Sequence, residues 1–249
     1  NYDFSIKNRF CICQKIVSLT CKTLNKSMLP IKIIEKKLDD SKLGFIEEVW
    51  DMLSYQLSIP KVDSRKILEE VISKYSEPHR SYHNLSHVYS LLMMAEEYYD
   101  FIENPILFEL SIWFHDLIYD PSRNDNEEKS AERALELLSP FLADSFLENL
   151  KQMILSTIEH APILKDQDNE LFLDLDMSVL ATETTVYDQY TAAIRKEYSI
   201  FTDEIYQAGR KSVLEKFMAG DQIFLTDFFK ENFEKQVVDN IQNELSGLG

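Results

Sequence analysis

Hydrophobic residues recur every three or four positions along most of this chain, which is the spacing of one face of an α-helix. The alternating β-branched pattern that is typical of strands is not seen. We therefore predict an all-α protein. The predicted helices are 42–57, 64–75, 84–101, one opened by Pro105, 126–138, 140–160, about 174–181, 183–200, 203–219 and 226–245.

Two details of this pattern bear on the predicted fold. Asp63 stands just before the second helix and is expected to be its N-cap. The helix opened by Pro105 is apolar nearly all round as far as Ile118, which predicts a central, buried helix.

The length of 249 residues suits one substantial domain. Clean amphipathic patterning begins only after Met28, so we expect residues 1–27 to be a peripheral N-terminal segment and residues 28–249 to be a single all-α domain. The three cysteines, Cys11, Cys13 and Cys21, lack a fourth metal-ligating partner and are interpreted as reduced thiols. Because no apolar run approaches membrane-spanning length, we expect a cytoplasmic protein without a membrane partner.

The charge balance narrows the possible partners. The chain has 26 basic and 43 acidic residues, for a net charge of −17. A field of this sign repels polyphosphate backbones and anionic membranes, which excludes general nucleic-acid binding. A small phosphorylated molecule can still bind if a metal ion or a few local cations cancel its charge.

All five histidines lie between residues 79 and 160. His83 and His87 are four residues apart and share one face of a helix, so they can bind one metal together or divide the roles of metal ligand and substrate contact. The residue after His83 is Asn84 and not glutamate, which disfavours a metalloprotease.

Two further patterns place carboxylates in apolar surroundings. His115-Asp116 ends the apolar helix, where a buried carboxylate needs a cation; alternatively, Asp116 caps a neighbouring helix while His115 donates to a carbonyl. Asp174 and Asp176 alternate with apolar residues in a later segment. Residues two apart lie on opposite faces of a helix, so we expect one aspartate to reach the site while the other caps or orients.

Together these elements resemble the HD-domain metal-dependent phosphohydrolases, whose pattern is His, then His-Asp, then a distant Asp. The phrase from Tyr82 to His87 is similar to the Tyr-His-Asn-x-x-His signature of cyclic-nucleotide phosphodiesterases in that superfamily. The closer likeness, over about residues 75–226, is to bacterial HD-superfamily proteins called predicted metal-dependent phosphohydrolases. They share the phrases Glu77-Pro78-His79-Arg80, Trp113-Phe114-His115-Asp116, Asn126-Glu127-Glu128-Lys129-Ser130-Ala131 and Ile194-Arg195-Lys196-Glu197-Tyr198.

The resemblance implies an HD-domain helical bundle and assigns roles by position. His83 would be the general acid, and His87, His115 and Asp116 would bind metal. Asp176 would complete the ligand set, with Asp174 as the alternative. The implied cofactor is a divalent ion (Mn, Fe, Ni, Mg or Zn), one or two per site, and Asp116 could bridge to a second ion.

Several other residues are candidates for contact with a substrate. Arg80 and Lys129 could clamp a phosphate, and Glu127 and Glu128 could orient water or a second metal; the alternative is a solvated loop and helix start. His160 could serve a second metal or the substrate, or could be a histidine at a helix end that is satisfied by carbonyls.

The expected function is hydrolysis of a phosphoester or pyrophosphate bond in a nucleotide-like small molecule by metal-activated water. One alternative is a catalytically inactive HD-fold module that binds metal or nucleotide. Another is a di-iron HD oxygenase, which would need additional histidine ligands. The sequence predicts neither the identity of the substrate nor the oligomeric state.

Overall fold

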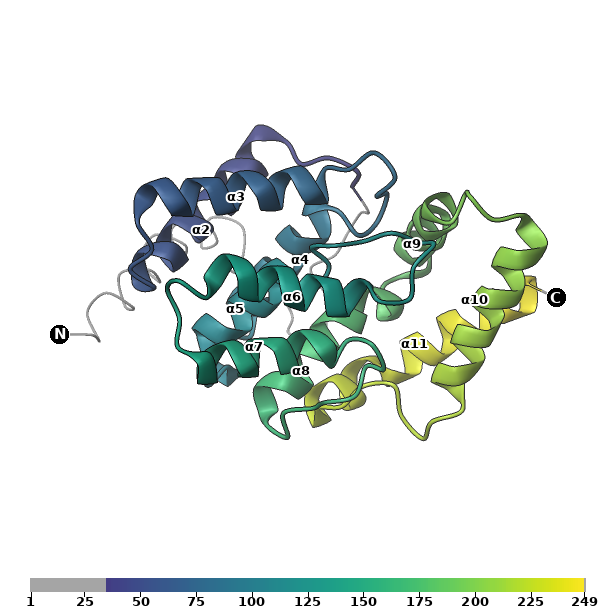
Figure 1. Cartoon of the computed structure of the whole chain (residues 1–249). Helices are drawn as coiled ribbons and strands as arrows, with labels where there is room; N and C mark the ends of the chain where they lie inside the picture. Colours follow the sequence, from purple (N-terminus) through teal and green to yellow (C-terminus); the bar gives the residue numbers. More distant parts are fainter. Residues whose placement is uncertain (1–34, 249) are drawn as a thin grey trace.

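The structure is a computed structural model that describes residues 35–248 (Figure 1). Within that range it is all-helical and has no strand, which confirms the predicted fold class. The predicted segment 1–27 lies outside the described residues. The helices are α2 (Asp40–Gln56), α3 (Lys61–Tyr75), α4 (Leu85–Glu97), η1 (Tyr99–Phe101), α5 (Pro105–Phe114), α6 (Asn126–Leu138), α7 (Asp144–Leu155), α8 (Gln167–Met177), η2 (Ser178–Ala181), α9 (Thr184–Glu197), α10 (Asp203–Met218) and α11 (Asp227–Gly247).

Several predicted helix boundaries were wrong. Helix α4 ends at Glu97 rather than at residue 101, and α9 ends at Glu197 rather than at residue 200. Helix α3 begins directly after Pro60, so Asp63 lies in its first turn and is not the N-cap. Helix α7 is shorter than predicted, and turns follow it up to His160, whose φ of 48° is left-handed. Helix α8 begins well before residue 174, because the side chain of Asp166 accepts a hydrogen bond from the N–H of Asn169 and caps it there.

Helix α5 lies at the centre of the fold, as its apolar sequence predicts. Every residue from Leu107 to Phe114 is buried, and the helix contacts α4, α6, α7 and α8. The indole of Trp113 packs edge-on against that of Trp50 from α2, with 5.3 Å between ring centroids. This packing fixes the C-terminal end of α5, where His115 and Asp116 follow.

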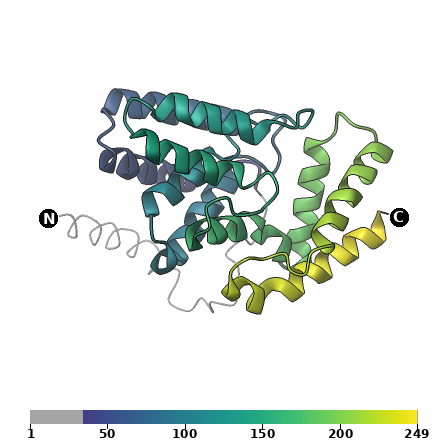
Figure 2. The same cartoon turned by 60° about the horizontal axis from the view of Figure 1, so that its bottom comes forward.

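Helices α9, α10 and α11 form the other end of the molecule, at the right of Figures 1 and 2. Helix α11 packs against η2 and α10. By contrast, α10 buries only Arg210 and Leu214. No helix among the described residues combines the length and apolar character needed to cross a membrane.

Candidate metal centre

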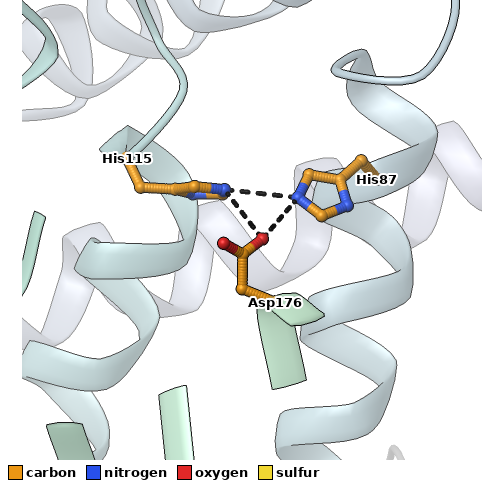
Figure 3. A group of neighbouring side chains, drawn as sticks. All are labelled: His87, His115 and Asp176. Carbon is orange, nitrogen blue, oxygen red and sulfur yellow. Dashed lines mark hydrogen bonds and ion pairs between the residues drawn. The ribbon is translucent and has the colours of Figure 1, made fainter. Parts of the chain in front are cut away.

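His87, His115 and Asp176 meet in the interior of the bundle (Figure 3). His87 lies in the first turns of α4, which begins after Asn84 because that side chain accepts the N–H of Ser86. His115 ends α5, and Asp176 lies near the end of α8. The Nε2 atoms of the two histidines are 3.2 Å apart. Oδ1 of Asp176 is 3.1 Å from Nε2 of His87 and 3.6 Å from Nε2 of His115.

These three atoms have the spacing of neighbouring ligands around one ion. Ligands bound at about 2.1 Å in octahedral or tetrahedral geometry are roughly 3.0–3.4 Å from one another. Nδ1 of His115 lies 3.1 Å from the carbonyl oxygen of Ile112, to which it can donate, leaving Nε2 free to bind metal. The group could therefore hold a metal ion.

Asp116 borders the same group. Its Oδ2 is 3.2 Å from Nε2 of His115 and 3.9 Å from Nε2 of His87. Burial raises the pKa of Asp116, but the charges of His115 and His83 outweigh burial and hold this pKa below its usual range. Burial also acts to lower the pKa of His115, which the two aspartates instead raise. The buried carboxylates thus require positive charge nearby, as the sequence indicates.

Asp174 points to a different part of the fold. Its Oδ1 accepts the N–H of Leu225 at 2.7 Å, and its Oδ2 accepts the N–H and hydroxyl of Thr226 at 2.8 and 2.6 Å. Burial raises the pKa of Asp174 to about 6, against the lowering effect of these donors. Asp174 therefore orients the segment before α11, and Asp176 alone of the two lies with His87 and His115.

His83 lies beside the candidate metal centre and is held by a buried glutamate at the end of α9. Nδ1 of His83 is 2.7 Å from Oε2 of Glu197, which also accepts the hydroxyl of Tyr119 at 2.9 Å. Oε1 of Glu197 accepts three consecutive backbone N–H groups, those of Ser81, Tyr82 and His83, at 2.7, 2.7 and 2.9 Å. Burial acts to raise the pKa of Glu197, but His83 and these donors lower it to about 2.

This environment favours the protonated form of His83. Burial alone would lower the pKa of the imidazole, but the charges of Glu197 and Asp116 outweigh burial and raise it. Glu197 has no role in the site predicted from the sequence. Its position carried a signal, because Glu197 continues the buried stripe of Tyr190 and Ile194 at helical spacing.

Arg80, expected to clamp a phosphate, is instead a buried structural residue. Its Nη1 donates to the carbonyl oxygens of His83 and Asp116 at 2.9 and 2.7 Å, and its Nη2 donates to that of Leu117 at 2.8 Å. The side chain is buried, so its donors are not available to a ligand. Arg80 therefore ties the turn before α4 to the end of α5, which corrects the sequence interpretation.

Lys129 and Glu128 do not line the cavity that adjoins Asp176 of the candidate metal centre. Lys129 pairs with Glu132 at 2.7 Å and borders a separate cavity of about 700 Å³. Glu128 is exposed in the first turn of α6. Glu127 is half-buried, and its pKa is raised by burial and by the charge of Asp116. Of these three residues, Glu127 is the one whose pKa is affected by the charge of Asp116.

His160 approaches the opposite oxygen of Asp176. Its Nε2 is 3.6 Å from Oδ2 of Asp176, and its ring packs edge-on against Phe217 at 5.8 Å. His83, His160 and Asp176 line one cavity of about 460 Å³. His79 is turned elsewhere, with its Nε2 2.8 Å from the carbonyl oxygen of Tyr119.

Comparison with family models, curated proteins and solved structures finds no match to this chain. The all-helical fold and the buried group of His87, His115 and Asp176 are compatible with an HD-like fold. What this site can do chemically therefore follows from its own donor atoms, its charges and the adjoining cavity.

Proposed function

We propose that the protein is a metal-dependent phosphohydrolase of the HD type, which cleaves a phosphoester or pyrophosphate bond of a nucleotide-like small molecule. One observation carries this proposal: a histidine held beside a buried carboxylate, His83, lines the same cavity as Asp176 of the metal centre. A proton donor and a cation site on one cavity are the two elements that expulsion of an alkoxide from phosphorus requires.

In the proposed site, His87, His115, Asp116 and Asp176 would hold the ion through two imidazoles and two carboxylates. A bound divalent cation supplies Lewis acidity, which neutralises charge on phosphoryl oxygens and lowers the pKa of water. The negative charge of the two carboxylates attracts a divalent cation and repels a phosphate group that arrives without one. Substrate phosphate is therefore expected to bind only with the ion.

His83 would donate a proton to the leaving oxygen. Glu197 accepts from Nδ1, so the opposite ring nitrogen, Nε2, is the one available to the cavity. The hydroxyl of Tyr119 and the three backbone N–H groups fix Glu197 and, through it, the orientation of the imidazole. Glu197 would thus be a positioning residue that keeps His83 protonated.

The test begins with protein stripped of metal by a chelator and assayed by phosphate release on a panel of phosphoesters and pyrophosphates. We expect no activity until Mn²⁺ or Ni²⁺ is added. His115→Ala should abolish the metal-restored activity, whereas Arg65→Ala, at an exposed position on α3, should retain it. Activity that survives both chelation and His115→Ala would contradict the proposal.

Two further measurements on the same protein separate the two rival functions. Tight nucleotide binding without turnover across the panel would favour an inactive binding module. An iron-specific colour with oxygen uptake would favour a di-iron oxygenase. A di-iron site would need an additional histidine ligand. His160 is placed for this role, because its Nε2 is 3.6 Å from Oδ2 of Asp176, whereas Nδ1 of His83 is bound to Glu197.

A further inference from the structure

The cavity that contains His83 and Asp176 extends away from the metal centre between α9 and α10. Its volume of about 460 Å³ lies within the range of small-molecule sites, about 300–1,000 Å³. Phosphate bound at the metal centre would fill only one end. The remaining walls are therefore what distinguishes one phosphate ester from another.

One face of α10 forms the outer wall. The residues that it contributes are spaced at three and four positions, as one helical face requires. They are Ile205, Tyr206, Gly209, Arg210, Val213 and Phe217. Gly209 lies at the middle of this face, and a Cβ built on it meets no atom within 4 Å.

A glycine at this position is not required by the backbone. Its φ is not positive, and glycine inside a helix costs about 0.5–1 kcal/mol relative to alanine. The missing side chain instead leaves the wall open between larger neighbours. Ile205 and Val213, on the same face, are 59% and 46% exposed, so apolar surface continues to the mouth of the cavity.

The charge of this wall excludes a second phosphate. Arg210 is the only lysine or arginine among the described residues that line the cavity. Its Nε and Nη2 bind the carboxylate of Glu244 at 2.7 and 3.0 Å. Its Nη1 lies 3.3 Å from the hydroxyl of Tyr190. The cation is therefore neutralised within the wall, and the group that binds there should be uncharged.

Four tyrosines and two phenylalanines also line the cavity. Tyr198 packs against Phe201 and Tyr206, each with 6.1 Å between ring centroids. Tyr190 and Phe217 add two more rings to the walls. Aromatic faces bind flat rings by stacking and edge contacts, and tyrosine adds a hydroxyl for polar edges.

We propose that this cavity holds a planar, uncharged aromatic group of the substrate, such as a nucleobase or another aryl ring, and that Gly209 determines its specificity. The substrate would then be a phosphate ester with its phosphoryl group at the metal centre and its ring against α10. This inference rests on the proposed function. It adds that esters of aromatic groups are preferred over small alkyl esters and over polyphosphates.

The cavity is first tested without metal or catalysis. Binding of 1-naphthol, a neutral fluorescent ring, is titrated into metal-free wild type, Gly209→Leu and the control Gly44→Leu. Gly44 is an exposed glycine of α2, and its Cβ likewise meets nothing within 4 Å. We expect Gly209→Leu to weaken binding at least tenfold and Gly44→Leu to change it less than twofold. Equal affinity in all three proteins would overturn the proposal.

Competition by adenosine and guanosine then identifies the kind of ring. Displacement of 1-naphthol by either nucleoside indicates that the cavity binds a nucleobase. If neither nucleoside displaces 1-naphthol, the natural ligand carries a different aryl group. Thermal unfolding of each variant verifies that it is folded. Leucine forms helices better than glycine, so Gly209→Leu should not lower the melting temperature.

Kinetics with bound Mn²⁺ provides the second measurement. Gly209→Leu should lower kcat/KM for 1-naphthyl phosphate at least ten times more than it lowers kcat/KM for methyl phosphate. Equal losses on both esters would overturn the specificity role. If neither ester is hydrolysed but 1-naphthol binding depends on Gly209, the phosphohydrolase function fails and the aromatic site remains. If both esters are hydrolysed and Gly209→Leu has no effect, the phosphohydrolase function stands and the aromatic site fails.

Discussion

Replacing Glu197 by glutamine tests the buried carboxylate that joins α9 to the turn before α4. Glutamine keeps the size of the side chain, and its Oε1 can still accept the three N–H groups from Ser81 to His83. What is lost is the negative charge opposite Nδ1 of His83 and the hydroxyl of Tyr119. The variant therefore isolates the contribution of charge at a site that is 1% exposed.

The size of the effect follows from the pKa of Glu197, which is lowered from 4.5 to about 2. A difference of one in pKa corresponds to about 1.4 kcal/mol, so the ionised carboxylate stabilises the fold by about 3–4 kcal/mol at neutral pH. We expect Glu197→Gln to lower the free energy of unfolding by that amount and the melting temperature by about 6–12 °C.

The pH dependence has a definite sign. A carboxyl group whose pKa is lowered by folding stabilises the fold above its unfolded pKa, here about 4.5. This contribution is lost as the pH falls towards 2. The difference between wild type and Glu197→Gln should thus be full at pH 7 and shrink between pH 4.5 and pH 2.

Urea unfolding followed by tryptophan fluorescence at pH 7, 5 and 3 measures this difference, with Glu231→Gln as the control. Glu231 is exposed on α11, so its replacement should change the free energy of unfolding by less than about 0.5 kcal/mol. A loss below 1 kcal/mol for Glu197→Gln at pH 7, or an equal loss at pH 7 and pH 3, would refute the reasoning.

Three further predictions use the same region. If His83 donates a proton, Glu197→Gln should lower the pKa of His83. As the pH is raised, kcat/KM of the variant should then begin to fall at a lower pH than kcat/KM of the wild type. An unchanged fall of kcat/KM at high pH would contradict this prediction. Asp174→Asn should lower the free energy of unfolding by about 1–3 kcal/mol and leave Mn²⁺ affinity, measured by calorimetry, unchanged, whereas Asp176→Asn should weaken Mn²⁺ binding. The reverse pattern of Mn²⁺ affinities would exchange their roles. Arg80→Met should cost about 3 kcal/mol or more in urea unfolding, because three buried carbonyls lose their donor, and a neutral result would restore a surface role for Arg80.

The fold class was predicted from the spacing of hydrophobic residues, whereas the grouping of His87, His115 and Asp176 was implied by the resemblance to HD-domain proteins. The apolar run after Pro105 indicated a buried helix, so His115 at its end was expected to lie in apolar surroundings. Helical geometry also showed that Asp174 and Asp176 point in opposite directions. It could not show which of them reaches His87, since that depends on how α8 packs against α4.

The residues that were misjudged are those whose partners lie far along the chain. Arg80 looked like a phosphate ligand because local sequence gives its charge but not the carbonyls that surround it after folding. Glu197 was one of 43 acidic residues, and only the fold brings it to His83. A glutamate on an otherwise apolar helix stripe was the available clue, because burial of an unpaired charge is costly.

The uneven burial of the helices divides the molecule into a part that resists mutation and a part that tolerates it. His87 and Asp176 lie on α4 and α8, and His115 directly follows α5; all three helices contribute buried residues to the core. The outer wall of the cavity is carried by α10, which buries only Arg210 and Leu214. Amino-acid changes on α10 are therefore expected to reshape the cavity while the core stays intact. Under the proposed function, ligand preference would then change while the candidate metal centre is retained.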